Sequence, residues 1–249
     1  MRSIILTGGN DGIGFFMAEQ LLKDGDRVAL LDISTDKIET LKAQYEDRLI
    51  VCKCDVSDVH AVQSCTDQIE LQWGAVDIAV HNACICLFTD LAQTSNDDYR
   101  RVFEVNFIGA VNLTRAVLPS MKQRGSGRIC FTSSGVGVMG FANISAYASS
   151  KGAIESFARC MDIESRPFGV SAHLLHPPLT RTASSKPLPV PPEFMADPKT
   201  VGQGLAKNLG KKRFVISHSF GQRIQTRMAY LLSLKLGRLM SRMTAKAQQ

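Results

Sequence analysis

The feature that most limits the possible folds is a regular alternation of short apolar runs with longer segments of helical spacing. The runs are rich in strand-forming residues and occupy residues 4–6, 28–31, 49–51, 76–80, 128–132, 170–175 and 214–216. Between them, apolar residues recur three and four positions apart, as in amphipathic helices, at residues 14–23, 36–45, 58–73, 97–121 and 147–166. Strands joined through helices form right-handed βαβ units in one parallel sheet with helices on both faces. The alternation therefore predicts an α/β, doubly wound fold of about seven strands.

Residues 177–198 interrupt this alternation because they hold most of the prolines: Pro177, Pro178, Pro187, Pro189, Pro191, Pro192 and Pro198. A long loop within a compact domain usually has a function, and we expect a substrate lid. A short helix near residues 200–208, the last strand and a C-terminal helix at about residues 222–243 follow. Since no repeat or linker occurs, residues 1–249 are expected to form a single domain. It contains the proline-rich lid at 177–198 and a basic amphipathic helix within 221–249.

The charge is unevenly distributed along the chain. The formal net charge is +6, but 11 of the 29 Lys and Arg residues follow Asp197, and no Asp or Glu does. Residues 1–197 therefore carry 18 basic against 23 acidic side chains, a net charge of −5. A mildly acidic body of this kind argues against a nucleic-acid partner that covers the whole chain.

Cysteine usage and hydropathy bear on the compartment. Seven cysteines are an odd number without the spacing of a disulfide scaffold, which favours a reducing, intracellular compartment. No apolar stretch near Met1 could serve as a signal-peptide core, and nowhere do 18 consecutive apolar residues occur. We expect a cytoplasmic protein, with membrane association left open.

A glycine-rich turn joins the first strand to the first helix. It reads Thr7-Gly8-Gly9-Asn10-Asp11-Gly12-Ile13-Gly14. Glycines at such a turn let the backbone approach a pyrophosphate, to which the helix N-terminus presents unpaired N–H groups and partial positive charge. This context favours a dinucleotide site over a merely structural turn. We therefore expect a Rossmann fold, with cofactor contacts from Gly8, Asn10, Asp11, Gly12, Ile13 and Gly14.

An acidic residue at the end of the second strand bears on which dinucleotide binds. Asp32 lies 18 residues after Gly14, where a carboxylate can accept hydrogen bonds from both adenosine ribose hydroxyls and would repel a 2′-phosphate. The glycine loop also has no Lys or Arg to pair with such a phosphate. The sequence therefore favours NAD over NADP, the alternative being that Asp32 only caps the following helix.

A second acidic position follows the third strand. Asp55 precedes Val56 there, and its carboxylate could meet the adenine amino group. Alternatively, Asp55 or Asp58 caps the next helix. The two roles are compatible, and the sequence does not separate them.

Polar side chains after the fifth strand suggest a catalytic group. Ser134 follows that strand, and Tyr147 and Lys151 come 13 and 17 residues after it. In a helix, Tyr147 and Lys151 lie on one face. A phenol with a pKa near 10 is a poor base, but an ammonium group and a nicotinamide cation both favour the phenolate. Tyr147 could then exchange a proton with a substrate oxygen, which Ser134 would hold, while hydride moves to or from the cofactor.

These residues together resemble the classical short-chain dehydrogenase/reductase family. The similarity spans roughly residues 3–182 and rests on the glycine turn, Asn82-Ala83, Asn106, Ser134, Tyr147 and Lys151. It implies that Tyr147 is the catalytic acid/base, that Lys151 lowers its pKa and binds the nicotinamide ribose, and that Ser134 orients the substrate oxygen. It also implies that Asn106 supports a water-borne proton relay to Lys151, although a buried amide that satisfies backbone groups would use the same hydrogen bonds. Asn82, Ala83, Asp55, Val56, Pro177 and Thr182 complete the expected cofactor contacts.

The chain departs from the family pattern at two positions. Cys84 follows Asn82-Ala83 where the family usually has Gly, which puts the geometry beside the adenosine ribose in doubt. The second departure is Pro177-Pro178, where the family usually has Pro-Gly. The Pro177-Pro178 pair, with Thr180 and Thr182 after it, is similar to the branch of 3-ketodihydrosphingosine reductases. That branch prefers NADPH, which Asp32 contradicts, so only a hydrophobic or lipid-like substrate is inferred from it.

The remaining clusters of His and Cys residues are expected to be structural. His81 with Cys84 and Cys86, together with Cys52 and Cys54, lacks the second ligand pair of a zinc site, so no metal is expected. Cysteines two apart share one face of a strand and behave as small apolar residues. His173 and His176 are expected to be hydrogen-bonded structural residues.

The C-terminal helix has two possible partners. It repeats apolar residues every three or four positions, with arginines mostly opposite, and the apolar positions are Ile224, Met228, Leu232, Leu236, Leu239, Met240 and Met243. Packing on the body or on another subunit is the simpler interpretation. A basic amphipathic helix can also lie in an anionic membrane surface.

Two functions from different classes follow. The first is an NAD-dependent oxidoreductase that interconverts a secondary alcohol and a ketone on a hydrophobic substrate. The alternative is a dinucleotide-binding peripheral membrane or scaffolding protein with little turnover. The family resemblance also implies a homodimer or homotetramer, built from the helices around residues 97–121 and 147–166.

Overall fold

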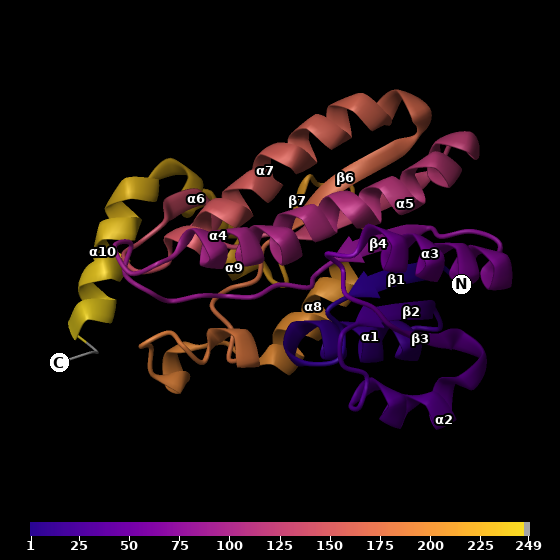
Figure 1. Ribbon diagram of the computed structural model, residues 1–249, viewed down its shortest axis with the longest axis horizontal. Helices are drawn as coiled ribbons and strands as arrows, with labels where there is room; N and C mark the ends of the chain where they lie inside the picture. The colour runs from indigo at the N-terminus through magenta and orange to yellow at the C-terminus, as the bar shows by residue number, and fades with distance from the viewer. Residues whose placement is uncertain (247–249) are drawn as a thin grey trace.

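The computed structural model describes residues 1–246 and contains one seven-stranded sheet (Figure 1). The strand order is β3-β2-β1-β4-β5-β6-β7, and every neighbouring pair is parallel. The strands are β1 Ser3–Thr7, β2 Arg27–Asp32, β3 Leu49–Lys53, β4 Ile78–His81, β5 Gly127–Thr132, β6 Val170–Leu175 and β7 Val215–Ile216. The predicted doubly wound Rossmann fold is confirmed.

Helices cover both faces of the sheet, so the central strands are buried on both sides. Helices α1 Gly12–Lys23 and α8 Pro198–Asn208 pack together on one face, where Ile4 and Leu6 of β1 also point. Helices α3 Val59–Trp73, α5 Gly109–Gln123 and α7 Ser145–Ser165 lie on the other face with Ile5. Successive residues of a strand point to opposite faces, which explains why the apolar runs in the sequence are continuous rather than alternating.

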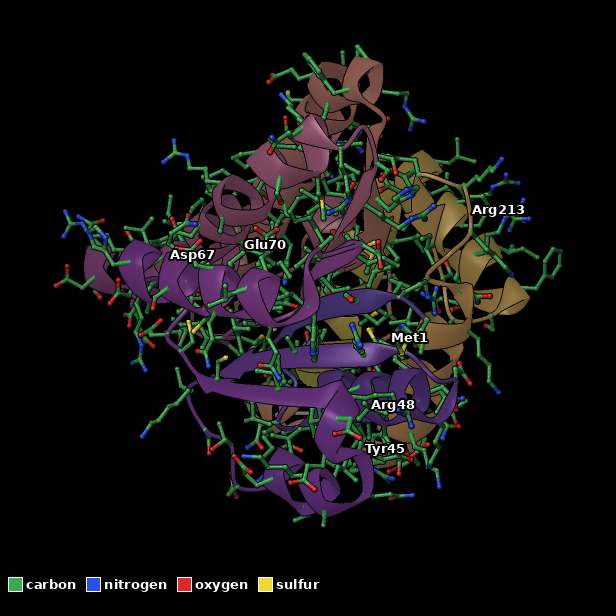
Figure 2. The ribbon with its side chains drawn as sticks, turned by 90° about the vertical axis from the view of Figure 1, so that its right-hand side faces the viewer. Met1, Tyr45, Arg48, Asp67, Glu70 and Arg213 are labelled. Atoms are coloured by element: carbon green, nitrogen blue, oxygen red, sulfur yellow. The ribbon has the colours of Figure 1, made fainter. Side chains whose placement is uncertain are left out.

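The chain reverses its direction of winding between β1 and β4. These two strands are neighbours although β2 and β3 separate them in the sequence. Ligands bind at such a switch point, outside the carboxyl ends of the strands. In Figure 1 the strand arrows point toward the side that carries α6 Val136–Met139, α10 Ser233–Lys246 and the 177–198 segment. Figure 2 views the opposite end, with Met1, Tyr45 and Arg48 in front.

Two predicted helices are interrupted in the structure. The helix expected at 97–121 consists of α4 Asn96–Phe103, a π-helical turn η3 Glu104–Ile108, and α5. The segment expected at 36–45 is a 3-10 helix, η1 Ile38–Leu41, followed by the short α2 Lys42–Tyr45. A π turn is a single turn of i→i+5 hydrogen bonds inside an otherwise α-helical segment, and the apolar residues on either side of it keep helical spacing, so the sequence predicts one helix here.

The expected C-terminal helix is also two helices. It breaks at Leu232, with φ −122° and ψ 31°, into α9 Phe220–Leu231 and α10. The break lets α10 pack on α6, where a side chain on Gly237 would come within 2.4 Å of the Gly140 carbonyl oxygen. Helix α6 itself was not predicted. Among the helices of residues 1–246, none is long and apolar enough to span a membrane.

The proline-rich segment folds back on itself. It contains two 3-10 turns, η5 Ala183–Ser185 and η6 Pro192–Phe194. Thr180 forms an isolated parallel bridge with Ala196, and Ser185 donates a hydrogen bond to the Thr180 carbonyl oxygen at 2.8 Å. The segment therefore has a defined conformation over the carboxyl ends of the strands.

Candidate active site

A cavity of about 920 Å³ lies at the carboxyl ends of the strands. Its wall includes the loops that follow β1 to β6, the 177–198 segment, and residues of α9 and α10. The predicted site residues on this wall are Gly8, Asp11, Gly12, Ile13, Asp32, Asp55, Val56, Asn82, Ala83, Ser134, Tyr147, Pro177 and Thr182. Four others, Asn10, Gly14, Asn106 and Lys151, are not part of the wall.

The glycine turn is shaped as a cradle for a pyrophosphate. Gly8 has a φ of +65°, and a side chain there would come within 2.5 Å of Ala83 Cα. One on Gly14 would come within 2.1 Å of the Gly8 carbonyl oxygen. Asp11 caps α1 by accepting from the Gly12 amide at 2.7 Å, whereas the amides of Ile13 and Gly14 have no partner within residues 1–246. These free amides at a helix N-terminus fit a dinucleotide phosphate.

Asn82 fastens three strand ends behind this cradle. Its amide group donates to the Gly8 carbonyl oxygen at 2.8 Å, and its amide oxygen accepts from the Thr132 hydroxyl at 3.1 Å. The Thr7 hydroxyl accepts from the backbone amides of Asn82 and Ala83. Residues after β1, β4 and β5 are thus held in one network, which explains why Asn82 and Ala83 accompany the glycine turn.

Asn10 has a supporting role rather than an open position. It is buried, and its side-chain oxygen accepts from the amides of Lys37 and Ile38 at 3.0 Å each. Its amide group donates to Asp36 at 2.7 Å. Asn10 therefore holds the loop after β2 against the glycine turn.

Asp32 and Asp55 both lie on the cavity wall. Asp32 accepts from the backbone amides of Asn10 and Ser34 at 3.0 and 3.2 Å. Asp55 accepts from the Ser57 amide and hydroxyl, whereas Asp58 caps α3 by accepting from the amides of its first turn. The capping role that the sequence left open thus belongs to Asp58, and the Asp55 carboxylate lies free of the helix.

A cation near the glycine turn was not foreseen. Lys37, which follows β2, forms an ion pair with Asp11 at 2.9 Å, and both side chains are half exposed. The hydrogen bond from the Lys37 ammonium group is the main cause that holds the pKa of the Asp11 carboxyl below its usual range, and the Gly12 backbone amide adds to it. Lys37 lies outside the glycine loop, so the absence of Lys and Arg from that loop gives no sign of it.

Ser134, Tyr147 and Lys151 come together as predicted. Ser134 and Tyr147 line the cavity, and the Lys151 Nζ lies 5.6 Å from the centre of the Tyr147 ring. Lys151 is fully buried, and its Nζ donates to the Thr132 carbonyl oxygen at 2.8 Å. The ammonium group is thereby fixed at the end of β5, one helical turn beyond Tyr147.

Burial sets the ionisation of both groups. Burial raises the pKa of the Tyr147 phenol well above its usual value, and a hydrogen bond with Ser134 opposes this rise only in part. Burial also lowers the pKa of the Lys151 ammonium. With these residues alone, Tyr147 is protonated at neutral pH, and a further positive charge in the cavity would favour its phenolate.

Asn106 lies in the π-helical turn η3 and is fully buried. Its side chain accepts from the Ile85 amide at 2.8 Å and donates to the Ile85 carbonyl oxygen and the Ser150 hydroxyl, each at 3.0 Å. Its own carbonyl oxygen lies 3.1 Å from His81 Nε2. Asn106 therefore holds the loop after β4 against α7, as the simpler interpretation expects.

The two departures from the family pattern are accommodated. Cys84 is not among the residues with positive φ, of which Asn143 is the one non-glycine case in residues 1–246. A side chain at this position therefore costs no backbone strain. Pro178 lies on the cavity wall, and its carbonyl oxygen accepts from the Thr180 hydroxyl at 2.8 Å.

A buried carboxylate next to the catalytic group escaped the sequence analysis. Glu155 is 4% exposed and accepts hydrogen bonds from Ser133, His176 and Tyr230, each at 2.6 Å. Arg159 adds a bond at 3.0 Å. These partners come from the ends of β5 and β6 and from α7 and α9. Glu155 lies four residues after Lys151 on the same helix face, but this spacing alone does not distinguish a buried carboxylate from a solvated one.

Three histidines, His81, His173 and His176, are buried and hydrogen-bonded within the fold. His173 is held by the Arg213 carbonyl oxygen at 2.6 Å and the Ser171 hydroxyl at 3.0 Å, and burial lowers its pKa to about 4. His176 is bound by Glu155. Burial lowers the pKa of His81 to about 3, which keeps this ring neutral. In the described part of the chain, no group of three or more His, Cys, Asp or Glu side chains is placed to hold a metal ion.

Known proteins with similar sequences are oxidoreductases, as the residues of this site suggest. The family model described as short chain dehydrogenase matches residues 2–190. The chain is 32% identical over 187 residues to a 3-dehydrosphinganine reductase of Danio rerio, and the aligned region covers 72% of this chain and 56% of that protein. It therefore spans little more than half the length of that relative. It is 33% identical over 216 residues to oxidoreductase UcpA of Salmonella typhimurium, which covers 85% and 81% of the two chains.

A solved structure supports the same assignment over the whole chain. The crystal structure of a short-chain dehydrogenase from Streptomyces avermitilis superposes with a TM-score of 0.83 over 100% of both chains, at 25% identity. The family model covers most of the chain, including the glycine turn and the Ser134, Tyr147 and Lys151 positions. The chain therefore belongs to the short-chain dehydrogenase/reductase family, whose members are NAD(P)-dependent oxidoreductases.

Proposed function

We propose that the protein is an NAD(H)-dependent oxidoreductase that interconverts a secondary alcohol and a ketone on a hydrophobic substrate. One observation carries this proposal: Ser134 and Tyr147 lie on the wall of the cavity that the glycine cradle also lines. Lys151 is held beside Tyr147. A reacting carbon–oxygen group and a dinucleotide can thus occupy the same cavity.

Each side chain has a defined task in this reaction. The bound nicotinamide supplies the hydride donor or acceptor. Tyr147 moves a proton to or from the substrate oxygen, and the Ser134 hydroxyl donates a hydrogen bond to that oxygen. Lys151 presents its ammonium group at the end of β5, where it favours the phenolate form of Tyr147 and can bind ribose hydroxyls. Asn106 holds the loop after β4 against α7 through its hydrogen bonds to Ile85 and Ser150.

A hydrophobic substrate is supported by the outer part of the cavity. Large apolar side chains line this part of the wall; they come from the 177–198 segment, from α6 and the loop that follows it, and from α10, and they are Met139, Phe141, Ile144, Leu179, Leu188, Val190, Leu236, Leu239 and Met240. Apolar walls with a few polar groups are usual for ligand sites. One relative is named for the reduction of 3-dehydrosphinganine. A screen of long-chain secondary alcohols with NAD⁺, and of the matching ketones with NADH, tests the proposal; no turnover of any of them would count against it.

The preference for NAD(H) depends on Asp32 at the end of β2. We expect NADH to bind more tightly than NADPH, because the 2′-phosphate would meet the Asp32 carboxylate. Replacing Asp32 by Ser removes this repulsion, so NADPH binding should strengthen by roughly 10- to 100-fold relative to NADH. Titration of cofactor fluorescence measures both affinities.

Lys37 provides the matched control for this experiment. Its ammonium group is paired with Asp11, so Lys37→Gln should change the ratio of the two affinities far less than Asp32→Ser does. Tighter binding of NADPH than of NADH by the unmodified protein would overturn the role given to Asp32. A loss of NADPH binding in Lys37→Gln would assign the 2′-phosphate to that lysine.

The raised pKa of Tyr147 predicts opposite pH profiles for the two directions. Alcohol oxidation needs the phenolate, and the fraction of phenolate increases with pH up to the pKa of Tyr147. We therefore expect kcat/KM for oxidation to rise from neutral to alkaline pH. Ketone reduction needs the phenol and should fall only where Tyr147 titrates. Initial rates in both directions over one buffer series test this, and an oxidation rate that decreases toward alkaline pH contradicts it.

A further inference from the structure

Helix α9 exposes a row of large apolar side chains. Phe220, Ile224, Met228 and Leu231 are 73, 49, 42 and 77% exposed, respectively. They are spaced four, four and three residues apart, so they share one face of the helix. The opposite face, with Thr226, is buried against the body. We call these four side chains the α9 stripe; such a contiguous row, unlike scattered surface residues, indicates a contact surface.

A basic hollow borders the stripe. Arg213, Arg223 and Arg227 line a depression of about 360 Å³ between β7 and α9, together with Ser217 and Tyr230. Figure 2 shows Arg213 at the edge of the molecule beside the C-terminal helices.

The arginines of the hollow lack a carboxylate partner in the described part of the chain; a carboxylate reaches only the wall of the hollow, where buried Glu155 accepts from Tyr230 at 2.6 Å. Within residues 1–246, none of the three arginines takes part in an ion pair. The Ser217 hydroxyl is buried and has no hydrogen-bond partner there. The positive charges of Arg213 and Arg227 lower the pKa of Arg223, with Arg213 contributing most. Three like charges and an unused hydroxyl around a concave surface are complementary to a phosphate group.

The positive charge around the stripe and the hollow favours an anionic bilayer over a second copy of this chain as the partner of this surface. Residues 198–249 contain 11 basic and no acidic side chains, and Lys235, Arg238 and Arg242 of α10 are exposed. A second copy in a twofold contact would bring the same surface against itself, so that arginines would face arginines. An anionic bilayer offers phosphates to the hollow and an apolar interior to the stripe.

We propose that the α9 stripe and the hollow of Arg213, Arg223 and Arg227 form a docking surface for an anionic phospholipid bilayer. The arginines hold head-group phosphates, and the stripe enters the boundary of the acyl chains. The inner side of the same helix lines the substrate cavity through Thr226 and Ala229. Docking would therefore place that cavity next to the acyl chains of the bilayer. The use of the cavity for a lipid-like substrate rests on the proposed function, but the docking does not depend on that function.

Vesicle co-sedimentation of the full chain tests the proposal without any substrate. We expect binding to vesicles of phosphatidylcholine with phosphatidylserine, little binding to phosphatidylcholine alone, and weakening by salt. The triple variant Arg213→Gln, Arg223→Gln, Arg227→Gln should bind the anionic vesicles on the order of 100-fold more weakly. The double variant Phe220→Ser, Leu231→Ser should also lose binding, which a purely electrostatic contact would not show.

The matched control removes three exposed cations elsewhere, as Lys23→Gln, Lys42→Gln and Arg100→Gln, and should keep vesicle binding. Titration with NADH checks that each variant is folded. Equal loss in the control would reduce the effect to net charge and overturn the proposal. Two other results would also overturn the proposal. In the first, the full chain binds inorganic phosphate but does not bind vesicles. In the second, the full chain is a dimer that binds no vesicles, and the Phe220→Ser, Leu231→Ser variant is a monomer. Because no turnover is measured, failure here leaves the proposed reaction untouched.

Discussion

Replacing Tyr147 by Phe is expected to lower kcat by roughly 100- to 10,000-fold, the range that a positioned acid/base contributes. The variant loses only the phenol oxygen, because the ring on the cavity wall is kept. The glycine cradle and the Asn82 network do not involve that oxygen. Binding of NADH should therefore remain within about threefold of the unmodified protein. Steady-state kinetics and fluorescence titration on the same preparation separate the two quantities.

Tyr45 supplies the control for this substitution. It is buried beneath the far end of the sheet, where its ring packs under Arg48 at 5.3 Å (Figure 2). Tyr45→Phe makes the same chemical change far from the cavity and should leave kcat unchanged. If Tyr147→Phe kept most of its turnover, another group would have to be the acid/base. If it lost NADH binding as well, the phenol would be part of the cofactor site rather than of the chemistry.

The cofactor half of the site was predictable because its chemistry is local. Gly14 is required within one strand–turn–helix unit, because a side chain there would meet the Gly8 carbonyl oxygen, and Tyr147 and Lys151 are one helical turn apart. Such spacings are visible in the sequence. The hydrogen bonds of Asn10 could not be read in the same way, since its partners Asp36 and Lys37 follow another strand. Only the folded chain brings that loop onto the glycine turn.

The other half of the site depends on contacts between distant segments. Nothing in the apolar spacing of α9 and α10 shows that the chain turns at Leu232, because the turn serves the packing of Gly237 on α6. Similarly, Tyr230 and Glu155 are 75 residues apart in the sequence, yet they are joined at 2.6 Å. A lone Glu on a helix is most often a solvated residue, so sequence spacing could not single it out from Glu164 of the same helix.

The Glu155 network is therefore expected to be the largest single contribution to stability near the site. Glu155→Ala leaves the Ser133 hydroxyl, His176 and the Tyr230 hydroxyl without their common acceptor in a buried space. Removing one partner of a buried charged group costs about 3–5 kcal/mol of the free energy of unfolding. Chemical denaturation measures this loss. If Glu155→Ala does not fold, Glu155→Gln keeps the shape and one acceptor oxygen, and should lose less.

The pH dependence distinguishes this network from ordinary packing. Burial alone would raise the pKa of Glu155, but hydrogen bonds, that from His176 first, outweigh burial and hold it below the usual value of 4.5. A lowered carboxyl pKa stabilises the folded state above that value, and the contribution is lost as the pH falls through the folded pKa. The stability difference between the unmodified protein and Glu155→Ala should thus shrink in acid. Glu164→Ala, on the exposed side of α7, should stay within about 0.5 kcal/mol at every pH. A difference that is constant from neutral to acidic pH would mean that Glu155 acts through its volume and not through its charge.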